Sequence, residues 1–366
     1  MNKQAVGYPK SKDDSDVRLL QLHFPKENHV KIALHLSFRF QSINQIHEKT
    51  KKLYTKEELE NFLVEMARIR CIYQRKDQEE LQYALIPLVI GLYELKGGEL
   101  TPEYVKVYDD YDNTSAYGLE FLSSKVSQMR TIPIEESITP EHKIATYNQV
   151  MKLVNENNGP FALLKCVCRE RQKILGENCK KTTREYVCLA MGMMASQLLF
   201  SGIGKELTQQ EAIETLTLNQ KEGLVLQPSG GQIPEFICSC CGCCCGILRL
   251  QKQLPYPAEF WTHDFYAELI TEKCVGCGLC EKSCQVNAIT INGESKKAKI
   301  DLNRCIGCGI CVTVCNQGAL SLKPVEKPST VPKDYDQLYE HIYNHKKGPL
   351  QKFLMGQKLK KGKHWR

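Results

Sequence analysis

The sequence predicts a multidomain α+β protein, with a helix-and-hairpin N-terminal part, a mostly helical cysteine-rich middle and a C-terminal part of cysteine loops and paired strands. Its 366 residues are enough for two or three domains, each with its own hydrophobic core. Of its 19 cysteines, ten lie between residues 166 and 245 and eight between 274 and 315. Helix-capping sequences and short alternating stretches follow one another along the chain, as in mixed α+β folds.

These features divide the chain into six segments. We expect a flexible N-terminus (1–15), the helix-and-hairpin domain (16–95), a helical connector (96–160), the cysteine-rich domain (161–250), the second cysteine block with its strands (264–324) and an extended, basic C-terminal tail (325–366).

The composition is that of an ordinary soluble protein, with 42% hydrophobic and 25% charged residues and a net charge of +7. The N-terminal stretch "MNKQAVGYPKSKDDSDVR" has no apolar core of the kind that a secretory signal needs. The apolar stretches "YALIPLVIGLY" and "VCLAMGMMASQLLF" are shorter than the roughly 20 residues that span a bilayer. We therefore expect a cytoplasmic protein, in which clustered cysteines indicate metal binding because disulfides are rare there.

The N-terminal domain has the sequence pattern of three helices followed by a hairpin. "HVKIALHLSF" and "SINQIHE" predict two helices, and "TKEELENFLVEMARIR" predicts a third that begins at a capping box of Thr55 with Glu58. Its apolar residues recur at helical spacing and form one face: Leu59, Phe62, Leu63 and Met66. "CIYQR" and "LQYAL" predict the two strands of a wing, in which Tyr83 and Leu85 alternate with polar neighbours.

This order is that of a winged-helix-like domain, which raises the hypothesis of a DNA-binding redox sensor. Residues 55–70 contain three basic and four acidic side chains, whereas a helix that enters the major groove should be positive. DNA is therefore the less favoured partner, and we expect the domain to dock a protein. Cys71, at a predicted strand start, fits a small buried residue.

The connector contains two predicted helices and little chemistry. "LKGGELTPEYVKVYDDYDN" predicts a loop and then a helix with an acidic, tyrosine-rich end. Thr139 before Pro140 predicts the start of the helix "PEHKIATYNQVMKLVNEN", which Asn158 and Gly159 would end.

The cysteine-rich domain is predicted from two further capping boxes. Thr182 with Glu185 predicts a helix over "TTREYVCLAMGMMASQLLF", with Cys188 on its first turns. Thr208 with Glu211 predicts a second helix, which ends at Gly223 before the strand "LVLQ".

The run "ICSCCGCCCGIL" then places six cysteines within eight positions, and chain reversal brings them toward the cysteines at 166–188. Neighbouring cysteines such as Cys240 and Cys241 point in different directions on an extended backbone. The pattern favours two ligand sets, or one set with free thiols, and we expect at least one iron–sulfur cluster here. A structural zinc ion and a metal-free run of thiols are the alternatives. The candidate metal ligands are Cys168, Cys179, Cys188, Cys238, Cys240, Cys241, Cys243, Cys244, Cys245 and, least securely, Cys166.

Arg169, which follows Cys168, has two interpretations. Its charge can offset that of thiolates or a cluster, but an arginine beside a cysteine is more often solvated.

The second cysteine block is an internal repeat with a specific spacing. "CVGCGLCEKSC" and "CIGCGICVTVC" each contain three cysteines two residues apart and a fourth three residues further on. Gly276, Gly278, Gly307 and Gly309 allow the backbone to wrap closely around a cluster. Zinc sites rarely repeat this spacing in tandem, so a pair of zinc ions is the weaker alternative. "AITING", "KAKID" and "ALSL" predict short strands beside the two runs.

Residues 268–323 resemble the bacterial two-cluster ferredoxins. In that family the fourth cysteine of each run binds the other cluster. The resemblance implies one [4Fe-4S] cluster on Cys274, Cys277, Cys280 and Cys315, and a second on Cys305, Cys308, Cys311 and Cys284. The family usually has proline after the fourth cysteine, whereas this chain has Gln285 and Asn316.

Most of the chain resembles a group of anaerobe iron–sulfur proteins with a winged-helix-like N-terminus, a "CxCR…CxCCxCCC" region and a two-cluster ferredoxin domain. "CVCR", "GLVLQ", "ICSCCGCCCG" and the two ferredoxin runs occur in the order of that group. The resemblance implies architecture and electron transfer with redox partner proteins, and it names no substrate. The basic C-terminal segment "QKFLMGQKLKKGKHWR" can contact an acidic partner, RNA or an anionic membrane surface, or simply aid solubility.

The sequence thus predicts an electron-transfer iron–sulfur protein more than a stand-alone enzyme. It contains no Gly-x-Gly-x-x-Gly after a strand, no P-loop and no Cys-x-x-x-Cys-x-x-Cys of radical enzymes. Two alternatives remain open, a reductase with the middle cluster as its active site and a cluster-based redox sensor that acts through the winged helix. No catalytic residue is assigned.

Overall fold

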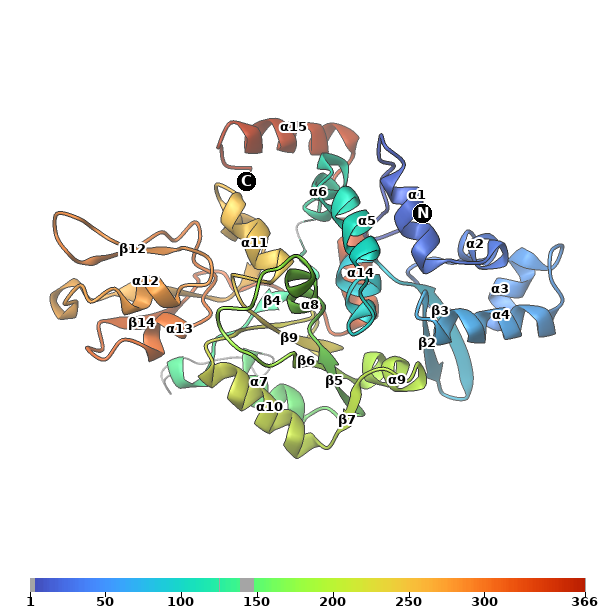
Figure 1. Cartoon of the computed structure of the whole chain (residues 1–366), viewed down its shortest axis with the longest axis horizontal. Helices are drawn as coiled ribbons and strands as arrows, with labels where there is room; N and C mark the ends of the chain where they lie inside the picture. Colours follow the sequence, from blue (N-terminus) through green and yellow to red (C-terminus); the bar gives the residue numbers. More distant parts are fainter. Residues whose placement is uncertain (1–3, 125, 139–147, 366) are drawn as a thin grey trace.

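The computed structural model describes residues 4–124, 126–138 and 148–365. It is a mixed α+β chain with several sheets. The N-terminal helices and hairpin lie at one end of the long axis, the second cysteine block lies at the other, and a five-stranded sheet with its helices lies between them (Figure 1).

The N-terminal part forms a small helical layer against a three-stranded sheet of order β1-β3-β2. Its elements are α1 (Ser15–His23), α2 (Glu27–Ala33), β1 (Gln41–Ser42), α3 (Ile43–Thr50), α4 (Lys56–Arg68), β2 (Ile72–Asp77) and β3 (Glu80–Leu85). The predicted capping box of α4 is confirmed, because Thr55 accepts from the Glu58 N–H and the Glu58 side chain accepts from that of Thr55. The hairpin of β2 with β3 is confirmed as well.

Two N-terminal expectations are wrong. The helix expected over residues 29–38 ends at Ala33, and the predicted flexible start is packed over residues 4–8, where Ala5, Val6 and Tyr8 are buried. Tyr8 donates to the carbonyl of Ile86, which fixes this segment beside the end of β3. The sequence did not predict this packing, because the few apolar residues of the N-terminal segment lie among polar ones without helical or strand periodicity.

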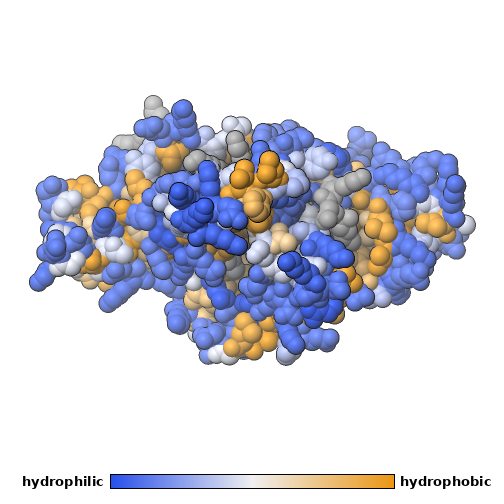
Figure 2. All heavy atoms as spheres, turned by 90° about the horizontal axis from the view of Figure 1, so that it is seen from above, coloured by the Kyte–Doolittle hydropathy of each residue, from blue (hydrophilic) through white to orange (hydrophobic). Residues whose placement is uncertain are grey.

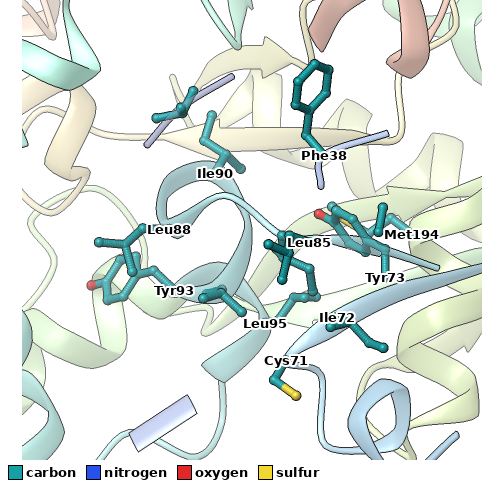
Figure 3. Close-up of a cluster of buried hydrophobic side chains, with 14 of the residues drawn as sticks. Phe38, Cys71, Ile72, Tyr73, Leu85, Leu88, Ile90, Tyr93, Leu95 and Met194 are labelled. Carbon is teal, nitrogen blue, oxygen red and sulfur yellow. The ribbon is translucent and has the colours of Figure 1, made fainter. Parts of the chain in front are cut away.

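The hairpin joins the largest hydrophobic core of the described residues (Figure 3). Cys71, Ile72, Tyr73 and Leu85 lie there among the buried side chains, with Met194 from the middle of the chain. The two parts are also tied by hydrogen bonds, since Gln197 accepts from the Gln74 N–H at 2.8 Å and donates to the Ala67 carbonyl at 2.6 Å. Cys71 is thus a buried core residue, as predicted.

The connector is irregular apart from its helices. η1 (Leu88–Leu92) and η2 (Glu94–Lys96) precede it, and its described elements are α5 (Pro102–Asp112), α6 (Ser115–Phe121), β4 (Arg130–Thr131), η3 (Glu135–Ser137) and α7 (Val150–Asn155). The tyrosine-rich helix is confirmed as α5, but its aromatic face is not solvated, since Tyr104, Tyr108 and Tyr111 are buried. The helix start predicted at Thr139–Pro140 lies outside the described residues.

The cysteine-rich domain is built on an antiparallel sheet of order β7-β5-β6-β9-β8 and is not mostly helical, contrary to expectation. The strands are β5 (Phe161–Lys165), β6 (Tyr186–Met191), β7 (Lys205–Leu207), β8 (Val225–Pro228) and β9 (Phe236–Cys240). The helices are α8 (Val167–Ile174), α9 (Gly192–Phe200), α10 (Gln209–Lys221) and α11 (Gly246–Gln253).

The helix predicted over residues 182–200 is wrong in its first half, which contains β6, and the helix begins only at Gly192, as α9. Thr182 accepts from the Arg184 N–H at 3.1 Å and so closes a local turn, and Glu185 pairs with Lys173 instead of capping a helix. Cys188 lies in the central strand β6, where Val187 and Leu189 point to the opposite face and are fully buried. The second capping box, Thr208 with Glu211, is confirmed at α10, and β8 follows Gly223 as predicted.

The second cysteine block folds around two pairs of antiparallel strands, β11 with β14 and β12 with β13. Its elements are η5 (Pro257–Glu259), β10 (Thr262–His263), β11 (Phe265–Leu269), η6 (Thr271–Lys273), α12 (Leu279–Ser283), β12 (Ile289–Ile291), β13 (Ala298–Ile300), α13 (Ile310–Thr313) and β14 (Leu320–Pro324). The three strands predicted in this block are therefore confirmed. β10 pairs with β4 of the connector.

The C-terminal tail is not extended over residues 335–360, because it forms α14 (Tyr335–Asn344) and α15 (Pro349–Lys360). Tyr335, Leu338, Tyr339 and Ile342 recur at helical spacing, and α14 buries them against the N-terminal part. α15 lies on the side of the molecule that Figure 2 faces, where apolar side chains interrupt a mostly hydrophilic surface. Within the described residues, none of the helices is both long and apolar enough for a membrane span.

Candidate metal centres

Four of the predicted ferredoxin ligands surround one cavity. Cys274, Cys277, Cys280 and Cys315 line it together with the two glycines of the first run. Gly276 has a φ of 70° and its backbone approaches the Lys296 carbonyl so closely that a Cβ would stand 1.8 Å from that oxygen. We call these four cysteines the outer set, because Cys277 is exposed.

The other four predicted ligands, Cys305, Cys308, Cys311 and Cys284, form the inner set. Cys305 and Cys311 are buried, and Cys308 and Cys284 are half-buried. Burial, together with the nearby charges of Cys284 and Cys305, raises the pKa of Cys308 to about 12. Cys305 and Cys311 lie in one buried cluster, against which Cys284 and Cys308 pack.

Backbone amides point at these sulfurs in a pattern that follows the sequence repeat. The N–H groups of Ala288 and Ala319 donate to Cys284 and Cys315 at 3.2 and 3.3 Å. Those of Ala298 and Ala267 donate to Cys274 and Cys305 at 3.4 and 3.3 Å. Such N–H···S bonds stabilise the negative charge of thiolates and of reduced clusters, so both cysteine sets fit [4Fe-4S] clusters.

The ten cysteines of the middle separate into two groups. The first, the four-cysteine group, consists of Cys179, Cys241, Cys243 and Cys244, whose sulfur atoms all lie within 4.8 Å of one another. Cys241 lies 3.4 Å from Cys243 and 3.6 Å from Cys179, and Cys243 lies 3.7 Å from Cys244. The hydrogen bond from Cys244, aided by the charge of Arg169, lowers the pKa of Cys241 to about 5 despite its burial.

The second, the six-cysteine group, is a ring of cysteines that lines one cavity: Cys166, Cys168, Cys188, Cys238, Cys240 and Cys245. Strand geometry explains much of it, because Cys238 and Cys240 are two residues apart in β9 and share one face, next to Cys188 in β6. Cys166 and Cys245 are the N-caps of α8 and α11. Cys166, the least secure of the predicted ligands, thus lies in the ring.

Cys240 and Cys241 confirm that neighbouring cysteines point in different directions. Cys240 faces the six-cysteine group and Cys241 faces the four-cysteine group.

Arg169 lies between the two groups and is buried, contrary to the expectation of a solvated side chain. Its guanidinium donates to the Ser239 carbonyl at 3.3 Å and to the Cys241 sulfur at 3.7 Å. Burial alone would lower the pKa of Arg169, but the charges of Cys166, Cys241 and Cys188 raise it overall. A buried cation here offsets negative charge on the surrounding sulfurs.

The six-cysteine group borders an apolar cavity. Ile90, Met129, Leu189 and Phe236 are among the residues that line it, with Glu94 as the one carboxyl group. Burial raises the pKa of Glu94 to about 8, although the Gly91 N–H donates to its carboxylate at 2.6 Å. Sequence reasoning missed Glu94, since a glutamate in "LYELK" carries no motif that marks it.

The middle of the chain is joined directly to the inner set. Gln285, which follows Cys284, is buried and accepts from the Gly242 N–H at 2.8 Å. A Cβ on Gly242 would stand 2.2 Å from the Gln285 carbonyl oxygen, so the two loops touch. On the other side, the Ile134 N–H donates to the Cys308 carbonyl at 3.1 Å. The only sequence signal for this contact is glutamine in the place where the ferredoxins have proline.

The fold and these cysteine sets define an iron–sulfur protein with a dicluster domain. Residues 273–319 match the family described as "4Fe-4S dicluster domain". No curated protein and no solved structure matches the chain. The dicluster domain implies two [4Fe-4S] clusters, and the four-cysteine group is a further candidate metal site.

Proposed function

We propose that the chain is an electron-transfer protein with two [4Fe-4S] clusters in residues 264–324 and at least one further metal centre in residues 161–250. The outer set binds one cluster and the inner set binds the other, by exchange of the fourth cysteine of each run. The observation that carries the proposal is that cysteines of the middle and of the ferredoxin-like part lie in one buried cluster of side chains. Cys240 and Cys245 of the middle belong to it together with Cys274, Cys280, Cys305 and Cys311.

The exposure of the outer set supports a direction for electron transfer through the chain. Cys277 of the outer set is exposed, and its neighbours Val275 and Leu279 are exposed apolar residues of the kind that a transient partner covers. The inner set is more buried and contacts the middle through Gln285. Electrons therefore enter or leave at the outer cluster and reach the middle centre through the inner one.

A polar cleft between the cysteine-rich and ferredoxin-like parts offers a second contact for an acidic redox partner. Cys243 and Cys284 line it, and its charged lining has more basic than acidic groups. The basic residues are Lys180, Lys181, Arg249, Lys252 and Lys282, against Glu177 and Glu281. The positive electrostatic field of these residues increases the association rate of an acidic protein and weakens as the salt concentration rises.

Iron, sulfide and low-temperature spectra of the anaerobically purified chain test the proposal. Two clusters of four irons each account for about eight irons in the dicluster domain. We expect more iron than this per chain. Replacing Cys277 and Cys308 together by serine should remove that dicluster signal, whereas Cys71→Ser is the matched control. A chain that holds no iron in residues 264–324, or whose clusters cannot be reduced and reoxidised, would contradict the proposal.

A reductase is the second candidate function, and the apolar cavity favours it. A buried carboxyl group, Glu94, shares this cavity with eight cysteines, an arrangement suited to a substrate that gains electrons and protons. Oxidation of the reduced clusters by a small organic acceptor, abolished by Cys188→Ser and slowed by Glu94→Gln, would favour a reductase over a carrier.

For the N-terminal part we propose a winged-helix domain that docks a protein. The order helix, short strand, two helices and hairpin over residues 27–85 supports it. The exposed side of α4 carries Glu57, Glu58 and Glu60, which repel phosphates. A shift assay with the chain's own upstream DNA should show no complex at low salt, and a sequence-specific complex would favour the redox-sensor alternative.

A further inference from the structure

We propose that the middle of the chain holds two chemically different centres: a single zinc ion bound by the four-cysteine group, and an iron–sulfur cluster bound by four of the sulfurs in the six-cysteine group. The inference deepens the proposed function, which requires only one further centre and leaves its metal open. It rests on how the sulfur atoms are spaced in the two groups.

The four-cysteine group has the dimensions of a mononuclear site. Its measured sulfur–sulfur distances are 3.4 Å for Cys241 to Cys243, 3.6 Å for Cys179 to Cys241, 3.7 Å for Cys243 to Cys244 and 3.9 Å for Cys179 to Cys243. Tetrahedral zinc with Zn–S bonds of about 2.3 Å places its sulfurs about 3.8 Å apart. In a cubane cluster each thiolate binds a different iron atom, which holds the sulfurs further apart than this.

The local backbone also suits a structural zinc ion. The amides of Cys244 and Cys245 both donate to the Cys241 carbonyl, at 3.3 and 3.0 Å, so "CGCC" forms a tight turn that presents three sulfurs at once. Cys179 supplies the fourth from the loop after α8, and a closed set of four cysteines is typical of structural zinc. Four thiolates with Zn²⁺ carry a charge of −2, part of which Arg169 offsets through its contact with Cys241.

The six-cysteine group has the opposite geometry. Its six sulfurs belong to residues that line one cavity, and they do not converge on one point. Among the described residues, only the four-cysteine group brings three or more metal-ligating atoms within 4.8 Å of one another. A wider, buried ring of thiols suits a polynuclear cluster, whose core fills the space between its ligands. Four sulfurs suffice for a [4Fe-4S] cluster, and two thiols remain.

Their places in the molecule agree with one redox-active and one inert centre. Cys240 and Cys245 of the six-cysteine group lie in the buried cluster that contains the ferredoxin cysteines, where a cluster can exchange electrons. In the four-cysteine group, Cys179 and Cys243 are half-buried and Cys243 lines the polar cleft, whereas Cys241 and Cys244 border the apolar cavity. Zinc has no redox chemistry, and here it would clamp the loop at 177–181 to the turn at 241–245.

Metal analysis of the full chain, produced anaerobically with both iron and zinc supplied, tests the inference. We expect about one zinc and about twelve irons per chain. X-ray absorption at the zinc edge should show four sulfurs at about 2.3 Å, a measurement that needs no variant. About sixteen irons without zinc, or zinc with nitrogen or oxygen ligands, would overturn the assignment of the four-cysteine group.

Paired variants separate the two centres. Cys241→Ser with Cys244→Ser should lose the zinc and keep all the iron, whereas Cys188→Ser with Cys238→Ser should lose about four irons and keep the zinc. Cys71→Ser is the control for replacing a buried thiol. Iron loss in the first pair, or unchanged iron in the second, would contradict the inference. Failure of the proposed function is distinguishable from failure of this inference. It would remove the dicluster signal and leave the zinc and the six-cysteine cluster in place.

Discussion

Gln285 is the residue that ties the inner set to the middle of the chain. Its side-chain oxygen accepts from the Gly242 N–H, and its own amide donates to the Ser283 carbonyl at 2.9 Å. Asn316 occupies the corresponding position of the second run and is exposed. The repeat thus contains a buried contact residue and a matched surface residue at equivalent places.

Replacing each by the proline that is usual in ferredoxins gives a first prediction. Gln285→Pro should lower the free energy of unfolding by about 1–3 kcal/mol, because a buried donor on Gly242 loses its partner. Asn316→Pro should change it by less than about 0.5 kcal/mol, as expected for an exposed position. Anaerobic denaturant titration of both variants measures the difference, and equal effects would show that the Gly242 contact is not important.

His23 predicts a pH dependence of the N-terminal part. It is buried beside the Tyr104 hydroxyl, 2.9 Å from its Nε2, and burial lowers its pKa to about 3. Because the unfolded histidine binds a proton near pH 6.5 and the folded one does not, stability is complete above that pH and decreases as pH falls below it. The loss should be about 1.4 kcal/mol at pH 5.5.

Unfolding monitored at pH 7.5 and 5.5 tests this, with His23→Gln as the variant and His345→Gln, at an exposed turn, as the control. His23→Gln should unfold with a smaller pH dependence whatever its absolute stability. A slope identical to that of the unmodified chain would exclude His23 as the cause.

Single residues also show where sequence reasoning succeeds and where it stops. The spacing of the ferredoxin runs predicts two sets of four cysteines, and the cysteines of one set line a single cavity: Cys274, Cys277, Cys280 and Cys315. The division of the middle cysteines depends on which strand face each occupies, and Cys188 was placed on a helix. The burial of Arg169 depends on β9 passing beside α8, which no local pattern encodes.

Among the elements, those with strong local signals were predicted and those that depend on tertiary contacts were not. α4 and α10 each begin at a reciprocal capping box, and the β2–β3 hairpin has its alternation. β6 was missed because Thr182 and Glu185 imitate a capping box, while its pairing with β5 and β9 is a non-local interaction. α14 and α15 were missed because lysines and prolines around them resemble a disordered tail.

The capping boxes give a prediction for individual helices. Thr55→Ala removes the side-chain acceptor for the Glu58 N–H of α4 and should reduce stability by about 1 kcal/mol without changing the iron content. Thr208→Ala should do the same at α10. Thermal unfolding with parallel iron analysis checks both, and loss of iron in either variant would mean that the helix contributes to a centre.

Glu120 anchors the C-terminal helices. Its buried carboxylate pairs with Lys346 and Lys352 and accepts from the Gly7 N–H at 2.8 Å. Glu120→Gln should destabilise the docking of α15 by about 2 kcal/mol, less than for a fully buried pair because both lysines are partly solvated. Glu340→Gln, which breaks an exposed pair with Arg39, should cost less than about 1 kcal/mol.

Limited proteolysis at the lysines of α15 measures that docking. Glu120→Gln should accelerate cleavage after Lys358 or Lys360, with iron retained, and Glu340→Gln should not. Equal cleavage rates would show that apolar packing alone holds α15.

At the scale of the whole molecule, the outer set with the exposed Cys277 lies toward one end and the N-terminal helices and hairpin lie at the other, with the five-stranded sheet of the cysteine-rich domain between them (Figure 1). The order of the segments along the chain was predicted, but their packing was not, because it depends on single contacts such as those of Gln285 with Gly242 and of Gln197 with Ala67. Contacts of this kind join residues 43 and 130 positions apart. Periodicity detects neighbours within one element and carries no information at such separations.

The same arrangement predicts the order in which the clusters are reduced. The outer set reaches the surface at Cys277, whereas no cysteine of the inner set is exposed. Cys305 and Cys311 of the inner set share a buried cluster with Cys240 and Cys245 of the six-cysteine group. When a slow protein reductant is mixed with the oxidised chain, freeze-quenched spectra should show the outer cluster reduced first and the middle cluster last.

Replacing Cys305 and Cys308 by serine removes the inner cluster while the outer ligands stay. Reduction of the middle cluster should then be strongly slowed, and that of the outer cluster unchanged. If the middle cluster is reduced equally fast without the inner one, electrons reach it by another surface, of which the basic cleft at Cys243 is the candidate. Raising the salt concentration would then slow its reduction, because an acidic partner is drawn to that cleft by charge.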